Sequence, residues 1–181
     1  GDYSKLPHTS SPYFEEPIVL FDGSKHNRFN LNVYHYDPTL APKGKTLITV
    51  MINTWEGDKW EQLAQDDPKK YQEEKKSLEK QILKRVEKII GPLDDVLEMV
   101  DVSTPHSVIR YTGNWQGSFE GFAPTKATLT KQLPKTLEGL SNFAMIGQWT
   151  SPGGGLPTAA KDGLDIAKKL CKEDGKRFTT G

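Results

Sequence analysis

Alternation of apolar and polar residues predicts three short strands in the first third of the chain. Residues 17–22 (PIVLFD), 29–36 (FNLNVYHY) and 46–53 (TLITVMIN) are rich in the β-branched and aromatic side chains that favour extended backbone. Asp22-Gly23 and the polar residues after it supply a turn between the first two, and a loop rich in Pro and Gly at residues 37–45 precedes the third. Strands that follow one another over short links favour an antiparallel sheet.

The spacing of apolar residues becomes helical after residue 67. Pro68 suits the first turn of a helix and Gly91-Pro92 ends the pattern, so we expect one long amphipathic helix between them. Its Lys and Glu residues are expected to form a solvated face. The apolar positions of this helix are Tyr71, Leu78, Ile82, Val86 and Ile89. Beyond it, residues 96–102 (VLEMVDV) favour a fourth strand, and Thr104-Pro105 opens a short helical or turn segment.

A strand, a glycine turn and a helix are predicted in succession near the C-terminal end. Residues 143–148 (FAMIGQ) have the composition of a short buried strand, residues 153–155 are all glycine, and residues 156–170 have helical apolar spacing. Residues 111–125 (YTGNWQGSFEGFAPT) interleave glycine with aromatic residues, which suits either a flat apolar ligand or a loop that covers the core. The whole pattern predicts an α+β fold, an antiparallel sheet with one long helix, followed by this strand, turn and helix.

Composition and charge narrow the classes of function. The 24 Lys and Arg residues balance the 24 Asp and Glu residues, so we do not expect nucleic acid as a partner. The one cysteine, Cys171, is expected to pack as a small apolar residue. Neither a metal site nor hydrolase chemistry is expected, because no nucleophile motif occurs and no histidine has the spacing of a metal ligand. The histidines are His8, His26, His35 and His106.

No targeting or membrane-spanning segment is visible in the sequence. No apolar run reaches the roughly 20 residues that span a bilayer, and the first ten residues lack the basic and apolar regions of a signal peptide. We therefore expect a cytoplasmic protein, with peripheral attachment of a longer parent protein to a membrane as the alternative.

Three consecutive glycines before a helix leave room for a flat or anionic ligand. The turn carries no side chains, and the N-terminus of the following helix adds N–H groups and a partial positive charge. A phosphate-binding loop needs Lys and then Ser or Thr after its last glycine, which Leu156-Pro157 excludes. A dinucleotide fingerprint would need Gly or Ala where Thr158 stands. The edge of a flavin ring fits this environment, and a purely structural tight turn accounts for it equally well.

The motifs around this turn carry a family resemblance. Residues 142–170 (NFAMIGQWTSPGGGLPTAAKDGLDIAKKL) contain a glycine that ends the predicted strand, a Pro-Gly-Gly-Gly turn followed by Leu and Pro, and the helix glycine Gly163. This segment resembles the C-terminal signature of the phytoene desaturase, carotenoid isomerase and retinol saturase family of FAD enzymes. Upstream, the loop at residues 37–45, Gly91-Pro92, Thr104-Pro105 and the glycines of residues 111–125 have counterparts in the same order. The resemblance therefore covers nearly the whole chain.

The resemblance implies the C-terminal part of a FAD-dependent oxidoreductase of the desaturase, saturase or isomerase type. Its substrate would be an isoprenoid or polyene-like apolar molecule. Residues 1–140 would form a substrate-side α+β domain, and residues 141–181 would belong to a FAD-binding domain of Rossmann-like fold. Backbone contacts with FAD would come from Gly147, Gly153, Gly154, Gly155, Leu156 and Pro157. Tyr111, Asn114 and Trp149 would lie on the substrate side, and no catalytic side chain is assigned.

This sequence departs from the family pattern in three respects. The G-x-G-x-x-G turn of the family and its acidic partner for the FAD ribose are absent from it. Asp162 stands where the family often has Ser, and Asp165 where a basic residue is common. We therefore expect the chain alone to be inactive and not to retain FAD. Its partner would be the missing N-terminal FAD-binding half, and without that half the chain would associate with itself. The alternative is a self-contained α+β binding module whose glycine turn is structural.

Overall fold

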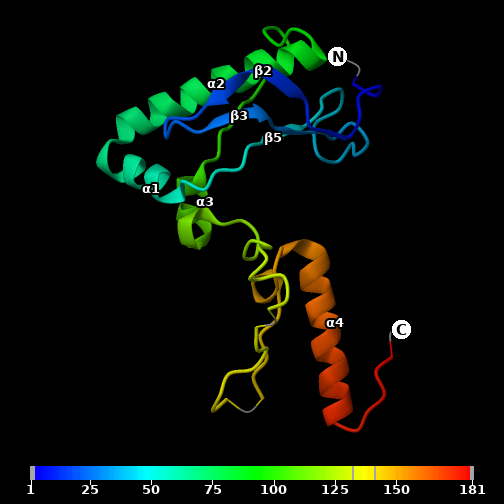
Figure 1. Cartoon of the computed structure of the whole chain (residues 1–181). Helices are drawn as coiled ribbons and strands as arrows, with labels where there is room; N and C mark the ends of the chain where they lie inside the picture. Colours follow the sequence, from blue (N-terminus) through cyan, green and yellow to red (C-terminus); the bar gives the residue numbers. More distant parts are fainter. Residues whose placement is uncertain (1–2, 132, 141, 180–181) are drawn as a thin grey trace. The chain divides into compact units, whose positions relative to one another are not determined.

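The strands form two small antiparallel sheets in the computed structural model, which describes residues 3–131, 133–140 and 142–179 (Figure 1). In one sheet β2 (Tyr13–Val19) pairs with β3 (Lys25–Arg28). In the other, β4 (Asn30–Val33) lies between β1 (Thr9–Ser10) and β5 (Ile48–Met51). The predicted α+β class and the antiparallel pairing are confirmed. The division into two sheets was not predicted, because β3 occupies residues that the sequence assigned to a turn.

The long helix is confirmed as α2 (Pro68–Ile90). The side chain of Asp67 accepts a hydrogen bond from the Lys70 amide at 2.9 Å, which caps the first turn. A further helix, α1 (Gly57–Asp66), precedes α2 and was not predicted. The short segment after Thr104 is α3 (Pro105–Thr112), where Ser107 Oγ accepts the Thr104 amide at 3.1 Å. The one-turn helix η1 (Trp115–Gly117) follows.

The prediction of a strand at residues 96–102 is wrong. The Leu93 carbonyl accepts the amides of Val96 at 3.0 Å and Leu97 at 2.9 Å, so the chain turns there and continues as irregular backbone. Met99 is 82% exposed and Val96 is 51% exposed. An apolar segment forms a strand only where a neighbouring strand pairs with its backbone N–H and C=O groups. Among the described residues no strand pairs with residues 96–102.

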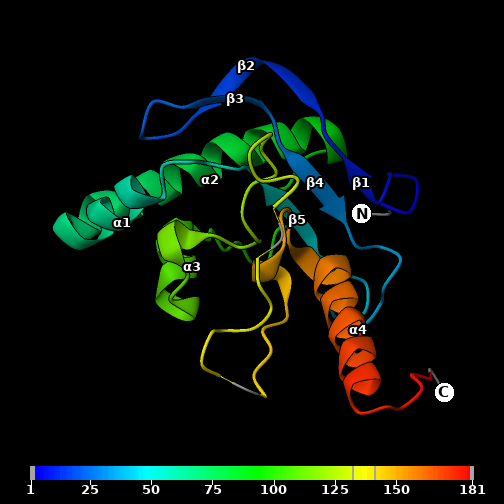
Figure 2. The same ribbon diagram turned by 60° about the horizontal axis from the view of Figure 1, so that its bottom comes forward.

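The core lies between α2 and the sheets (Figure 2). Polar side chains of α2 also bind the backbone of β2. The guanidinium of Arg85, which is 5% exposed, donates to the carbonyls of Glu16 and Pro17, each at 2.9 Å. The side-chain amide of Gln81 accepts the Val19 N–H and donates to the Val19 carbonyl, both at 3.0 Å. The buried apolar residues of this core are Ile18, Leu20, Phe29, Leu31, Val33, Val86 and Leu93.

The elements above belong to the first of two units, Gly1–Gly117, and the second unit is Ser118–Gly181. The second unit contains η2 (Gln148–Thr150), α4 (Gly155–Glu173) and long stretches of irregular backbone. The predicted C-terminal helix is confirmed as α4. The sequence-based division at residue 140 falls inside the second unit, and the assignment of residues 141–181 to a FAD-binding domain stays a prediction.

The prediction of a strand at residues 143–148 is wrong. Residues 143–146 are irregular, and η2 begins at Gln148. Phe143 is 40% exposed and Ile146 is 55% exposed, so the apolar run is not buried in this unit. A strand needs a neighbour for its N–H and C=O groups, and no strand lies in the described part of the second unit. None of the helices among the described residues combines the length and the apolar composition that crossing a lipid bilayer requires.

Candidate functional site

The three glycines of the predicted turn join η2 to α4 in backbone conformations that other residues avoid. Their φ angles are 84° at Gly153, 59° at Gly154 and 78° at Gly155. The Gly153 amide donates to the Phe122 carbonyl at 3.0 Å, and the Gly155 amide donates to the side-chain oxygen of Gln148 at 3.2 Å. The turn is therefore held by its own unit at both ends.

One side of the turn is packed against backbone. A Cβ atom on Gly154 would overlap the amide nitrogen of Gly121 and would lie 2.8 Å from its Cα. A Cβ atom on Gly121 would in turn overlap the carbonyl oxygen of Gln148. Real side chains do not approach backbone atoms this closely, so the packing of the second unit requires glycine at both positions even without a ligand.

The other side of the turn is open. A Cβ atom on Gly153 or on Gly147 would meet no other atom within 4 Å, and one on Gly155 would meet its nearest neighbours only at 3.8 Å. Leu156, the next residue, is 87% exposed. A flat ligand could therefore approach the backbone from the side of Gly153 and Gly155, beside the first turn of α4.

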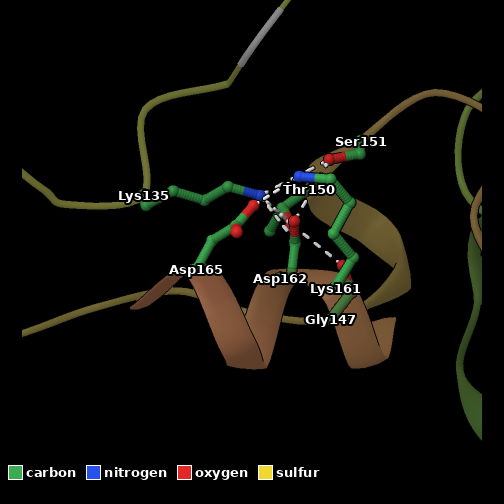
Figure 3. A network of polar contacts seen from close by, with 7 residues as sticks. All are labelled: Lys135, Gly147, Thr150, Ser151, Lys161, Asp162 and Asp165. Atoms are coloured by element: carbon green, nitrogen blue, oxygen red, sulfur yellow. Dashed lines mark hydrogen bonds and ion pairs between the residues drawn. The ribbon is translucent and has the colours of Figure 1, made fainter. Parts of the chain in front are cut away.

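A network of polar side chains fixes the residues that lead into the turn (Figure 3). At its centre is Asp162 on α4, a carboxylate that is only 6% exposed. Lys135 Nζ lies 2.5 Å from Asp162 Oδ2 and 2.7 Å from Thr150 Oγ1. Thr150 Oγ1 also contacts the Asp162 carboxylate and lies 2.8 Å from the Gly147 carbonyl. The network thus connects three separate segments of the second unit.

The charge of Asp162 is maintained by its partners. Burial on its own raises the pKa of this carboxyl group, but the hydrogen bonds from Lys135 and Thr150, with the positive charge of Lys135, outweigh burial and lower the pKa below its usual 3.8. Asp165, one turn along α4, instead forms an exposed pair with Lys161 at 2.5 Å. The two acidic departures from the family pattern therefore have different surroundings, one inside the unit and one at its surface.

The substrate-side residues predicted from the sequence are divided between the two units. Trp149 lies in η2, is 43% exposed and belongs to the same unit as the turn. Tyr111 lies in the last turn of α3 and is 80% exposed, and Asn114 follows the end of that helix. Both residues therefore belong to the first unit. The placement of Tyr111 and Asn114 near the turn stays a prediction, as does every predicted FAD contact. In the described residues no group of three or more His, Cys, Asp or Glu side chains has the arrangement of a metal site.

Sequence reasoning missed Lys135 and missed the structural role of Gly121. Lys135 and Asp162 are 27 residues apart, and nothing in the local pattern pairs them. The one available signal was that Asp162 stands where the family often has Ser. For Gly121 the signal was the third glycine of residues 111–125, which the sequence could not connect with a particular neighbour.

Comparison with known proteins finds a distant relative. The chain is 28% identical over 137 residues to 4,4'-diaponeurosporene oxygenase of Staphylococcus haemolyticus (strain JCSC1435). The match covers 74% of this chain and 26% of that protein, so the chain spans about a quarter of the length of this relative. No protein-family model and no solved structure matches the chain. The chain is thus distantly similar to a protein named as an oxygenase of 4,4'-diaponeurosporene.

Proposed function

We propose that the chain is the C-terminal part of a FAD-dependent oxidoreductase that acts on an isoprenoid or polyene-like apolar substrate. The observation that carries this proposal is the glycine turn with an open side at the start of α4. The distant similarity to an oxygenase named for a carotenoid supports the substrate class. Desaturation, saturation and isomerisation of the substrate are all compatible with these observations.

The residues at the turn leave room for a flavin ring, because an added Cβ on Gly147 or Gly153 would meet no other atom within 4 Å. Beside Gly155 the nearest side-chain atoms belong to Glu120 and Pro157, each 3.8 Å from an added Cβ. Gly147, Gly153, Gly155, Leu156 and Pro157 would line the ring with backbone atoms, while Gly154 would shape the turn from behind. The N-terminus of α4 would favour negative charge at the edge of the ring. When bound, FAD supplies a centre that accepts or gives a hydride, so the chain itself needs few reactive side chains.

The side chains near the turn would then orient and shield the site. The Lys135, Thr150 and Asp162 network would hold residues 147–151 in place, because it contacts them from α4 and from residue 135. Leu156 and Trp149 would offer apolar surface to the substrate or to the ring, since both side chains are exposed. The N-terminal half that binds the nucleotide part of FAD would come from the rest of the parent protein.

A second candidate is a self-contained binding module with a structural turn. The close approach of Gly121 and Gly154 favours it, because that contact explains two of the glycines without any ligand. That contact does not involve Gly153, whose positive φ favours glycine in either candidate but whose added Cβ would meet no other atom within 4 Å, so that only a bound ligand would be disturbed by it. Gly153 is therefore the position at which the two candidates differ.

The experiment compares Gly153→Ala with Gly175→Ala in the parent protein that the proposal implies. Both glycines have positive φ, 84° and 67°, and an added Cβ meets no other atom within 4 Å at either. Each substitution should therefore cost a similar backbone strain of about 1–2 kcal/mol. Only Gly153→Ala should lower the flavin content and the turnover. Equal flavin content and turnover in the two variants would contradict the proposal and favour the binding module.

A further inference from the structure

A groove on the first unit has the chemistry of a small-molecule site. It encloses about 390 Å³, which lies within the range of about 300–1,000 Å³ that ligand pockets in proteins occupy. Its walls come from β3, from the start of β4 and from the segment that follows β5. The residues that matter for its chemistry are His26, Arg28, Phe29, Met51, Asn53 and Trp55.

Arg28 brings a preoriented positive charge to this groove. Its Nη1 donates to the Ser11 carbonyl at 3.0 Å, and the guanidinium lies over the Tyr13 ring at 5.2 Å from the ring centroid. No carboxylate lies within ion-pair distance of Arg28 among the residues that the structure describes. Since a guanidinium has five N–H donors, Arg28 can bind an oxyanion while it keeps its bond to Ser11.

The charge of Arg28 is not neutralised by the acidic residue at the rim. Glu56 lines the groove, but its carboxylate pairs with Lys59 Nζ at 2.8 Å. His26 also lines the groove, where its Nε2 contacts Ser24 Oγ at 3.3 Å. Asp22 is a second acidic residue beside the groove, and its carboxylate accepts the Ser24 amide at 2.7 Å and contacts Thr54 Oγ1 at 3.5 Å. The preference for an oxyanion is therefore local to Arg28.

Apolar and aromatic surface lies beside this charge. Phe29 is 2% exposed and forms part of the floor, whereas Met51 is 41% exposed. Trp55 is 86% exposed, so almost the whole indole ring is available to a ligand. A large aromatic side chain next to an unpaired guanidinium suits a molecule with a flat apolar part and a charged end.

We propose that this groove binds a small oxyanion, a carboxylate or a phosphate, that is attached to a flat apolar body. Arg28 receives the oxyanion, and Trp55 and Met51 contact the apolar body. This site belongs to the first unit, contains none of the residues of the glycine turn and stands independently of the proposed flavin chemistry.

The test titrates three probes into the 181-residue chain and follows backbone amide shifts by NMR. The probes are naphthalene-2-carboxylate, 2-naphthyl phosphate and the neutral naphthalene-2-carboxamide. At least one anion should shift the amides of residues 24–30 and 51–56, with the neutral amide binding roughly tenfold more weakly. The tighter of the two anions identifies the source as a carboxylate or a phosphate ester. Equal binding of all three probes, or shifts confined to other residues, would overturn the proposal.

Three variants separate binding in the groove from general effects of charge. Arg28→Gln should weaken binding of the anion roughly tenfold or more and leave the neutral probe unchanged. Arg110→Gln is the control, because its guanidinium also lies over a tyrosine, Tyr111, at 5.4 Å, but outside the groove. Trp55→Ala, at a side chain too exposed to affect folding, should weaken all three probes about three- to tenfold. Unchanged affinity in both Arg28→Gln and Trp55→Ala would refute the assignment.

Discussion

Lys135→Met should loosen the second unit by removing the cation that faces the Asp162 carboxylate. Asp162 is 6% exposed, while the side chain of Lys135 is 25% exposed. Loss of one partner costs about 3–5 kcal/mol in a fully buried pair and about 0–1 kcal/mol in an exposed one. Because solvent screens Lys135 in part and Thr150 still contacts the carboxylate, we expect a loss of about 2 kcal/mol.

Hydrogen exchange of the α4 amides measures this loss within the second unit. A change of about 2 kcal/mol corresponds to roughly 30-fold faster exchange, since every 1.4 kcal/mol is a factor of about ten. Lys161→Met is the matched control on the same helix: the side chains of Lys161 and Asp165 are 73% and 51% exposed, so solvent screens this pair and its loss should leave the exchange of α4 nearly unchanged. Equal exchange of α4 in the two variants would refute the reasoning.

The same pair gives this unit a defined dependence on pH. The folded pKa of Asp162 is below its usual 3.8, so its contribution to stability is fully present above the unfolded pKa and is lost as pH falls through the folded value. Stability from this group should therefore stay constant from pH 7 to about pH 5 and fall below about pH 4. Asp162→Asn should remove that fall. A variant with the same loss at low pH would show that other groups cause it.

Three further experiments test other parts of the structure. After incubation with FAD and gel filtration the chain alone should be colourless, because the proposed nucleotide-binding half is not part of it; a yellow stoichiometric complex would contradict the proposal. Gly154→Ala should lower the thermal stability of the second unit by more than the backbone strain of about 1–2 kcal/mol that Gly153→Ala causes, since only its Cβ overlaps Gly121, and equal melting would show that Gly121 moves aside. Arg85→Met should cost about 2–3 kcal/mol in urea unfolding, because two carbonyls of β2 lose a buried charged donor, and a loss below about 0.5 kcal/mol would mean that water replaces it.

Apolar periodicity predicted α2 and α4, although the buried residue of α4 is the polar Asp162 and Leu164 of its apolar stripe is 38% exposed. It located α2 and α4 because each carries a stripe that does not depend on distant partners for its pattern. It missed α1, where a buried Trp60 lies in a helix that is otherwise strongly polar. It also missed β3, because KHNR has no apolar residue and forms a strand only by pairing with β2.

The two wrong strands show the limit of local pattern. Residues 96–102 and 143–148 have strand composition, yet each would need a neighbour to pair with, and pairing is a property of the fold rather than of the segment.

The sequence located the candidate site along the chain but did not predict which residues pack around it. Consecutive glycines before a helix located the turn, but its packed and open sides depend on Gly121, which is distant in sequence. The pairing of Lys135 with Asp162 was likewise invisible, because a lysine in a polar stretch and an aspartate in a helix each suggest exposure to solvent.

The contact of Gln81 with β2 bears on how the edge of this strand is protected from pairing with another molecule. An edge strand with free N–H and C=O groups can recruit a strand from another molecule and begin aggregation. Val19 pairs with Lys25 of β3, and the Gln81 side chain accepts its N–H and donates to its C=O, as the backbone of a further strand would. One helical glutamine therefore acts as a substitute strand at this residue and denies an incoming chain the hydrogen bonds it would need there.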